Sequence, residues 1–364
     1  MLRSAATWSA AAGIAYLSVA LVRMRRFERR ACARATAFPS VTILKPLAGI
    51  EDGLYENLCS FCEQEYPVYK VLFSVREADD PAADVARRVV ERFPQRAELV
   101  AGGPAIDAAN PKVANLSQII ERANGDVLVF ADADMRVAPS YLLEIVEPLA
   151  DPKVGAVTCL FAGSGRDPIS VFAAQAINEQ FVPSVLVAGA LEPMRYCIGA
   201  TIAMRRSDFA AIGGLEALAP HVADDYKVGM LVAERGMRVA LADYVVEDVI
   251  AEPSLLTLWE HELRWSRTIR SVRPFGHAFS FLTYGLPLAI LAGRVELILA
   301  AAALRVAMHY TSATALGVRD PGSPLLIPLR DTFSLAVWAA SFFGRNVTWR
   351  ERRLRLDASG LIER

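Results

Sequence analysis

The stretch VLVFADAD, at residues 127–134, combines an apolar run with an acidic turn. The run is rich in β-branched and aromatic side chains, which is typical of a strand inside a sheet. Asp132 and Asp134 follow it, and on an extended chain carboxylates spaced by two point to the same side. Two hard oxygen donors suit Mg²⁺ or Mn²⁺ that also holds a diphosphate. The stretch therefore predicts a metal site at the end of a buried strand.

The segments on both sides of this stretch alternate between strand-like and helix-like patterns. Strand-like runs lie at 41–44, 71–75, 97–100 and 126–131, and helix-like stretches lie between them at 53–65, 82–94 and 114–123. This alternation, from about residue 38 to 250, predicts an α/β fold with a mostly parallel sheet covered by helices on both faces. Ligands bind such sheets beyond the carboxyl ends of their strands.

Two more acidic groups fit this edge of the sheet. Asp79 and Asp80 follow the 71–75 run, although helix capping alone could explain an acidic pair before Pro81. Asp225 lies where a helix begins, and there it could accept a proton from an attacking hydroxyl, with Asp224 as the helix cap. Several carboxylates at one edge favour a site over capping alone.

Residues 254–270 predict an amphipathic helix that carries a basic and aromatic cluster. His261 and Arg264 are three apart and share its polar face. Arginine suits a phosphate clamp because its planar fork donates two parallel hydrogen bonds. Trp265 follows the clamp, whereas Trp259 is equally consistent with an anchor at a membrane interface.

Composition points to a membrane protein. The chain has 364 residues, of which 54% are hydrophobic, and 39 basic against 40 acidic residues, so no broad attraction to nucleic acid is expected. Its mean hydropathy is +0.29. Residues 5–22 carry no charge and are about long enough to span a bilayer. Arginines follow this run instead of preceding it, which favours a membrane helix over a signal peptide and places the middle of the chain in the cytoplasm. They are Arg23, Arg25, Arg26, Arg29, Arg30 and Arg34.

Three further apolar stretches lie near 276–292, 295–317 and 324–343. Two crossings after the cytoplasmic segment return the arginine-rich tail to the cytoplasm, and three would not. We expect 276–292, which contains Pro287 and His277, to be interfacial or re-entrant, and the other two stretches to span.

The five cysteines are scattered and odd in number, which argues against a disulfide framework. They are Cys32, Cys59, Cys62, Cys159 and Cys197. Cys59 and Cys62 form a CxxC, but a zinc site would need further ligands nearby. We expect thiols on a buried helix.

In this order the motifs resemble the ceramide glucosyltransferase family, which are inverting glycosyltransferases with a GT-A catalytic domain. The resemblance runs from about residue 38 to the tail Trp349-Arg350. It rests on Leu44-Lys45-Pro46-Leu47, Tyr66-Pro67, Asp79-Asp80-Pro81-Ala82, Asn110-Pro111-Lys112, residues 132–137, Asp224-Asp225-Tyr226 and Arg264-Trp265. The cluster His-Glu-Leu-Arg-Trp at 261–265 and Gly276-His277 also resemble the bacterial branch that glycosylates hopanoid lipids.

The resemblance implies roles for these residues and a UDP-sugar donor, either UDP-glucose or UDP-N-acetylglucosamine. Asp225 would be the general base, and Asp132 with Asp134 would hold the metal and diphosphate. Asp80, Lys112, Asp132, His261, Arg264 and Trp265 would contact the nucleotide sugar. The acceptor would be ceramide or a hopanoid in the membrane. His261 departs from the Gln or Arg usual in the family, and Asp134 gives a full DxD where eukaryotic members tend to carry a small residue.

These expectations divide the chain into five parts. A membrane helix with a basic segment covers 1–37, and a cytoplasmic GT-A domain covers 38–252. Interfacial helices follow at 253–292, then two membrane helices at 293–345 and a basic cytoplasmic tail at 346–364. A bacterial inner membrane is the expected location. A processive polysaccharide synthase is the alternative among enzymes, although it needs more membrane helices. A non-catalytic membrane scaffold with a vestigial nucleotide site is the alternative outside enzymes.

Overall fold

The computed structural model describes residues 2–27, 38–103, 105–349, 352–357 and 360–363. The chain divides into two compact units. We call Arg29–Phe161 with Pro193–Val249 the sheet unit, and Met1–Glu28, Ala162–Glu192 and Ile250–Glu363 the helical unit. Residues 162–192, expected inside the catalytic domain, thus belong to the helical unit. Arg29, Arg30, Arg34 and Cys32 lie outside the described residues.

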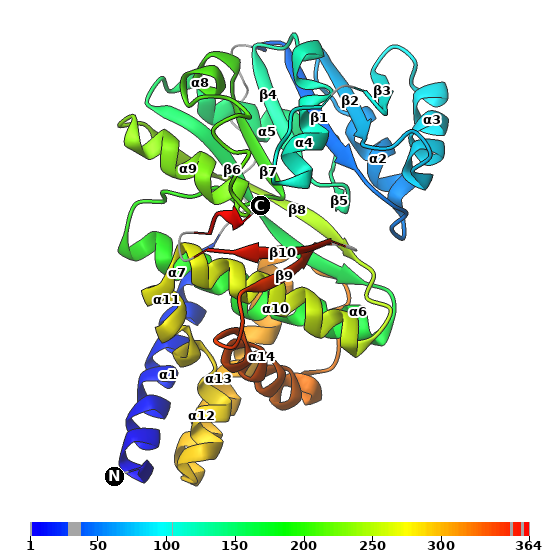
Figure 1. Cartoon of the computed structure of the whole chain (residues 1–364). Coiled ribbons are helices and arrows are strands. Elements are labelled where there is room, and N and C mark those ends of the chain that lie inside the picture. The colour runs from blue at the N-terminus through cyan, green and yellow to red at the C-terminus, as the bar shows by residue number, and fades with distance from the viewer. Residues whose placement is uncertain (1, 28–37, 104, 350–351, 358–359, 364) are drawn as a thin grey trace. The chain divides into compact units, whose positions relative to one another are not determined.

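The sheet unit is built on an eight-stranded sheet of order β3-β2-β1-β4-β7-β6-β8-β5 (Figure 1). Its strands are β1 (Val41–Leu47), β2 (Tyr69–Val75), β3 (Ala97–Ala101), β4 (Val127–Ala131), β5 (Met135–Arg136), β6 (Val154–Gly165), β7 (Thr201–Arg205) and β8 (Arg238–Ile250). The half β3-β2-β1-β4 is parallel, with Val41 opposite both Tyr69 and Val127. Strand β7 pairs antiparallel with both β4 and β6, and β8 pairs antiparallel with β5. The α/β fold expected from the alternating runs is confirmed.

Crossover helices connect the parallel strands, as such strands require. They are α2 (Leu54–Cys62), α3 (Pro81–Arg92) and α4 (Pro111–Ser117), the last followed by the 3₁₀ turn η1 (Ile120–Arg122). A second 3₁₀ turn, η2 (Glu147–Ala150), precedes β6. The unit also contains α5 (Tyr141–Val146), α8 (Arg206–Ala211) and α9 (Asp224–Glu234). Cys59 and Cys62 are free, buried thiols on α2, and burial raises the pKa of Cys62 to about 12, so neither is a reactive thiolate.

The helical unit assembles from three separate segments of the chain. Its helices are α1 (Leu2–Arg25), α6 (Pro168–Ala176), α7 (Val182–Leu191), α10 (Leu255–Val272), α11 (Pro274–Phe279), α12 (Gly285–Ala292), α13 (Val295–Leu316) and α14 (Ile327–Ser341). A π-helical turn, η3 (Ile177–Phe181), separates α6 from α7, and 3₁₀ turns lie at η4 (Ser280–Thr283) and η5 (Pro324–Leu326). A small antiparallel sheet of β9 (Asn346–Trp349), β10 (Arg352–Leu356) and β11 (Ile362–Glu363) ends the chain.

Among the described residues, two helices are long and apolar enough to cross a membrane, Ser4–Arg25 and Val295–Leu316. The pair α11–α12 is bent by 64° at the break around Tyr284, so it has the shape of a broken span or a re-entrant loop. Helices α1, α12 and α13 lie side by side (Figure 1). A Cβ on Gly13 would lie 2.8 Å from the Gly285 Cα, so only small residues permit this approach.

The expected span at 324–343 has a different character in the structure. Its helix, α14, has only 15 residues, which is short for a bilayer crossing. Arg330 and Asp331 lie in its first half, 0% and 1% exposed. At 15 residues α14 is shorter than a bilayer crossing needs, and among the described residues it is not one of the helices long and apolar enough to span.

A network of buried charged groups joins α13, α14, η3 and α10. Arg305 donates to Asp331 at 2.8 Å and lies 3.3 Å from the Glu179 carboxylate, which is 2.7 Å from the His309 Nδ1. Arg330 pairs with Glu262 of α10 at 2.6 Å. Buried charges are tolerated when they are paired and hydrogen-bonded in this way. The network therefore fixes α13 and α14 to the helix that carries His261.

Candidate functional site

The acidic stretch that follows β4 is a turn in the structure, not an extended segment. Its backbone is held by Lys45 of β1, whose Nζ donates to the Asp132 carbonyl at 2.5 Å and lies 3.6 Å from the centre of the Phe61 ring. Burial lowers the pKa of Lys45 to about 7, although Asp134 and Asp132 act in the opposite direction. Lys45 was visible in the sequence only as part of the motif Leu44-Lys45-Pro46-Leu47, because its contact with the turn depends on the pairing of β1 with β4.

Lys112 connects two of the predicted site residues. It lies at the start of α4, where Asn110 caps the helix, and its Nζ is 2.6 Å from the Asp132 Oδ1 and 3.8 Å from the Asp224 Oδ2. Burial alone would lower the pKa of Lys112, but Asp132 and Asp224 outweigh it and raise that pKa. Lys112 is therefore a fixed cation among the carboxylates of Asp132, Asp224 and Asp225, which we call the carboxylate cluster.

Asp134 is a buried carboxylate with an unsatisfied atom. Its Oδ1 is buried without a hydrogen-bond partner among the described residues. Burial raises the pKa of Asp134 to about 7, and the neighbouring charges of Glu51 and Asp132 act in the same direction. Carboxylates crowded in this way gain from a nearby cation.

The acidic pair fits a divalent cation that is shared with a substrate. Within the described parts of the chain, no group of three or more His, Cys, Asp or Glu side chains is arranged to hold a metal ion. Mg²⁺, however, is usually bound through one or two carboxylates together with substrate phosphates and water. Asp132 and Asp134, with the orphaned Oδ1 of Asp134, match that kind of open site.

Asp225 faces the same space as Asp132. A Cβ built on Gly199 would lie 3.1 Å from the Asp225 Oδ2 and 3.4 Å from the Asp132 Oδ2, so both carboxylates lie close to the position where a side chain would project from this residue. Burial raises the pKa of Asp225 to about 7, Asp224 raises it further and Lys112 opposes them. Ala223, not Asp224, is the N-cap of α9, and Asp224 instead accepts from the Asn110 Nδ2 at 3.3 Å. The expected capping role of Asp224 is therefore wrong.

Asp80 serves as a helix cap in the structure. Its Oδ1 accepts from the backbone N–H groups of Ala82 and Gly49, each at 2.8 Å, and it is the N-cap of α3. Helix capping alone is therefore sufficient to explain Asp80, and a contact between Asp80 and a nucleotide stays a prediction.

The basic and aromatic cluster lies on α10 in the helical unit, as the amphipathic pattern predicted. The His261 Nδ1 is 2.7 Å from the carboxylate of Glu252, which is buried, and the His261 and Trp265 rings are 4.6 Å apart. Glu252 fixes one ring nitrogen and leaves the Nε2 edge for another partner. Trp259 packs on Phe333 at 5.5 Å, so it is part of the helical core. The structure does not test whether His261, Arg264 or Trp265 contacts a nucleotide sugar.

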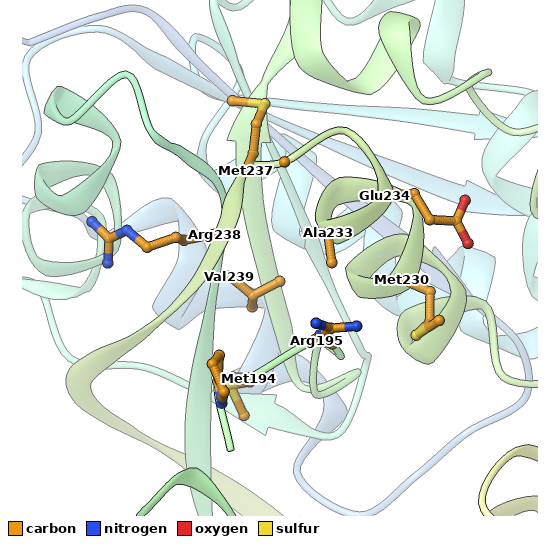
Figure 2. A pocket seen from close by; sticks show the side chains of 10 residues that line it. Met194, Arg195, Met230, Ala233, Glu234, Met237, Arg238 and Val239 are labelled. Carbon is orange, nitrogen blue, oxygen red and sulfur yellow. The ribbon is translucent and has the colours of Figure 1, made fainter.

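A separate pocket of about 440 Å³ lies at the far end of α9 from Asp225. Figure 2 shows it between α9 and the start of β8, with Met194, Met230 and Val239 among its lining residues. It contains no predicted site residue. The pocket is therefore distinct from the carboxylate cluster.

Comparison with known proteins identifies the family. The family model described as glycosyl transferase family 21 matches residues 5–362. The chain belongs to glycosyl transferase family 21. This family 21 glycosyltransferase is similar to ceramide glucosyltransferase 3 of Caenorhabditis elegans, 23% identical over 232 residues that cover 63% of this chain and 50% of the relative. The ceramide glucosyltransferase of Gibberella zeae is 32% identical over 127 residues, which cover 32% of this chain and 24% of the relative. The chain thus spans half, or less, of these relatives.

A solved structure confirms the GT-A fold of the family 21 enzyme. The mannosyltransferase PcManGT from Pyrobaculum calidifontis, in complex with GDP-Man and Mn²⁺, has a TM-score of 0.59 and 21% identity. The match covers 94% of this chain and 99% of that chain. The family resemblance seen in the sequence motifs is confirmed, and with it the assignment as an enzyme.

Proposed function

We propose that this glycosyltransferase transfers a hexose from a UDP-sugar to a hydroxyl group of a membrane lipid, with inversion at the anomeric carbon. The observation that carries the proposal is that Asp225 and Asp132 both lie within 3.4 Å of a Cβ built on Gly199, so their carboxylates are close together. A proton acceptor and an anion-holding group then face one space, as a single displacement needs. The ceramide glucosyltransferases among the relatives and the apolar helices α1 and α13 support a lipid acceptor.

Asp225 is the proposed general base. Its carboxylate takes the proton of the lipid hydroxyl while the hydroxyl oxygen attacks the anomeric carbon. The bond from that carbon to the diphosphate oxygen breaks, and UDP leaves with the bonding electrons. A pKa near 7 suits this role because the group is then a stronger base than an ordinary carboxylate and is still substantially ionised at neutral pH.

The diphosphate is proposed to bind at Asp132 and Asp134. These two residues would hold Mg²⁺ or Mn²⁺, which supplies electrostatic stabilisation for the departing diphosphate when it is bound. Lys112 orients Asp132 through their 2.6 Å ion pair and adds positive charge beside the leaving group. Asp80, His261, Arg264 and Trp265 keep the nucleotide-sugar contacts that the family resemblance implies.

The membrane arrangement is proposed to contain three crossings: α1, the bent pair α11–α12, and α13. The bent pair replaces the 324–343 stretch, whose helix has only 15 residues. Three crossings keep residues 38–252 and the arginine-rich tail on the same side, which the positive-inside rule places in the cytoplasm. A reporter enzyme that is active only in the cytoplasm should therefore be active when it is fused after residue 364, and a reporter that is active only outside the cytoplasm should be inactive there.

Turnover of detergent-solubilised protein tests the function directly. Release of UDP is measured with UDP-glucose or UDP-N-acetylglucosamine and with ceramide or a hopanoid polyol as acceptor. Mass spectrometry should show a single glycolipid, whereas a ladder of products would support a processive synthase. Asp225→Asn should lower kcat by roughly 10²- to 10⁴-fold with little change in donor binding. Asp243→Asn, an exposed position on β8, is the matched control. Near-normal turnover of Asp225→Asn would show that Asp225 is not the base.

A further inference from the structure

The helical unit contains a basic cavity, and none of the candidate site residues lines it. It has a volume of about 470 Å³ and is lined by α10, the chain that follows α14, and the end of β10. Its lining residues are Arg267, Arg270, Ser271, Pro274, Phe342, Gly344, Arg345, Leu356 and Asp357. Three arginines against one aspartate leave it strongly positive.

Among the described lining residues of this cavity, three arginines face a single acidic residue, Asp357. Arg267 and Arg270 donate to the carbonyl oxygens of Phe343, Gly344 and Asn346 at 2.6–2.7 Å, and these contacts are uncharged. The Arg267 Nε is buried without a hydrogen-bond partner among the described residues. Burial lowers the pKa of Arg267 and of Arg270, and the charge of a neighbouring arginine, Arg345 in the case of Arg270, lowers it further. The arginines thus repel one another in a partly desolvated cavity.

The arginines could simply cap the C-terminal end of α14. Such capping explains their contacts with the carbonyl oxygens but does not explain why the cavity contains three arginines. A cation near a helix C-terminus is favourable, and one arginine would satisfy that need. Arg345 adds a third positive charge and is exposed. Asp357, the acidic residue of the lining, already accepts from the Leu361 N–H through its Oδ1 at 2.9 Å.

Large apolar side chains project into solvent beside the cavity. Phe275 follows Pro274 and is 83% exposed, and Phe343 lies between two lining residues and is 76% exposed. Exposed aromatic residues next to arginines are typical of a surface that enters the interface of a membrane. Basic cavities in that position suit the phosphate head groups of anionic lipids.

We propose that this cavity binds the phosphate of an anionic membrane phospholipid, with Arg267, Arg270 and Arg345 as its ligands and the exposed phenylalanines beside the acyl chains. Planar guanidinium groups bind phosphate oxygens in pairs, which favours arginine over lysine for this task. The site requires neither a donor sugar nor an acceptor, so it does not depend on the function proposed above.

Native mass spectrometry of the full-length protein tests the proposal. Delipidated protein is presented with equal amounts of phosphatidylglycerol and phosphatidylcholine in detergent, and the bound lipids are counted. Wild-type protein should retain phosphatidylglycerol in preference to phosphatidylcholine. Arg345→Gln removes an exposed side chain with little risk to the fold, and it should weaken phosphatidylglycerol binding about fivefold. Unchanged thermal unfolding would show that the variant is folded.

Arg355→Gln is the matched control, because Arg355 lies on β10 of the same basic tail but pairs with Glu363 at 3.0 Å and does not line the cavity. An equal loss in both variants would show diffuse attraction to the tail and would overturn the proposal. Equal retention of the two lipids by wild-type protein would overturn it as well. A third arm adds millimolar inorganic phosphate or UDP. Release of phosphatidylglycerol by either would assign the cavity to a soluble phosphate instead of a lipid.

Discussion

Replacement of Gly199 by alanine tests the carboxylate cluster with the smallest possible change. The added Cβ would lie 3.1 Å from the Asp225 Oδ2, 3.4 Å from the Asp132 Oδ2 and 3.7 Å from the Asp225 Cγ. Because the first distance is shorter than an ordinary van der Waals contact, the Asp225 carboxylate must move by a few tenths of an ångström. The methyl group also fills space between the two carboxylates, where the reacting carbon is proposed to lie.

The expected loss can be worked from this displacement. A misplacement of 1 Å at a reacting centre costs on the order of 10²-fold in rate, so a shift of half that size should lower kcat about tenfold. The stability of the fold should change little, because the contact is with the ends of side chains that can rotate. A change from glycine to alanine also stabilises a chain by about 0.4–1 kcal/mol where the backbone permits it.

The assay is the release of UDP, measured beside thermal unfolding in the same detergent. Gly189→Ala is the control, because no heavy atom lies within 4 Å of its added Cβ. It should release UDP at the wild-type rate and unfold at an equal or slightly higher temperature, because alanine is favoured over glycine inside α7. If Gly199→Ala turns over at the wild-type rate, the chemistry does not occur between Asp132 and Asp225. A large fall in melting temperature would instead attribute the loss of activity to the fold.

Three further predictions use the same protein. The value of kcat/KM should rise with pH through about 7, because protonated Asp225 cannot accept a proton, and a flat profile between about pH 6 and 8 would contradict its role. A chelator should abolish turnover and Mn²⁺ or Mg²⁺ should restore it, with Asp134→Asn needing at least about tenfold more metal; full activity in the chelator would exclude the metal site. Asp331→Asn should destabilise the fold by about 3–5 kcal/mol, because it leaves Arg305 buried without its main partner. Its melting temperature should fall well below that of Glu296→Gln, an exposed control on α13, and equal values would show that the buried pair contributes little.

Local patterns in the sequence were sufficient for the elements that carry the site. A few neighbouring residues predict the strand at 127–131 and the helix that begins near Asp225. The spacing of apolar and polar residues along 254–270 predicts the amphipathic helix there. Each is decided by side chains within one or two turns of the chain. Their positions could therefore be predicted before any tertiary contact was known.

The partners of the site residues could not be predicted in the same way. Lys45 reaches the Asp132 backbone across 87 residues, and Glu262 meets Arg330 across 68. Such pairs depend on strand order and helix packing, which one sequence does not specify. The same limit applies at 324–343, whose hydropathy predicts a span: the pairing of Asp331 with Arg305 of α13 depends on helix packing and has no signal in the local sequence.

The contact between Gly13 and Gly285 also sets an order of events during synthesis. Gly285 leaves the ribosome about 270 residues after Gly13, which at 5–20 residues per second is roughly 15 to 50 s later. During that interval α1 has no access to α12 or α13, whereas the residues of the sheet unit have all been translated before the chain reaches residue 250. Until α12 and α13 emerge, α1 can therefore pack only on α7, which is translated earlier, and the helical unit is completed only when translation is nearly over. Premature termination before residue 285 would release a chain with the whole sheet unit and a helix α1 that lacks its partners α12 and α13.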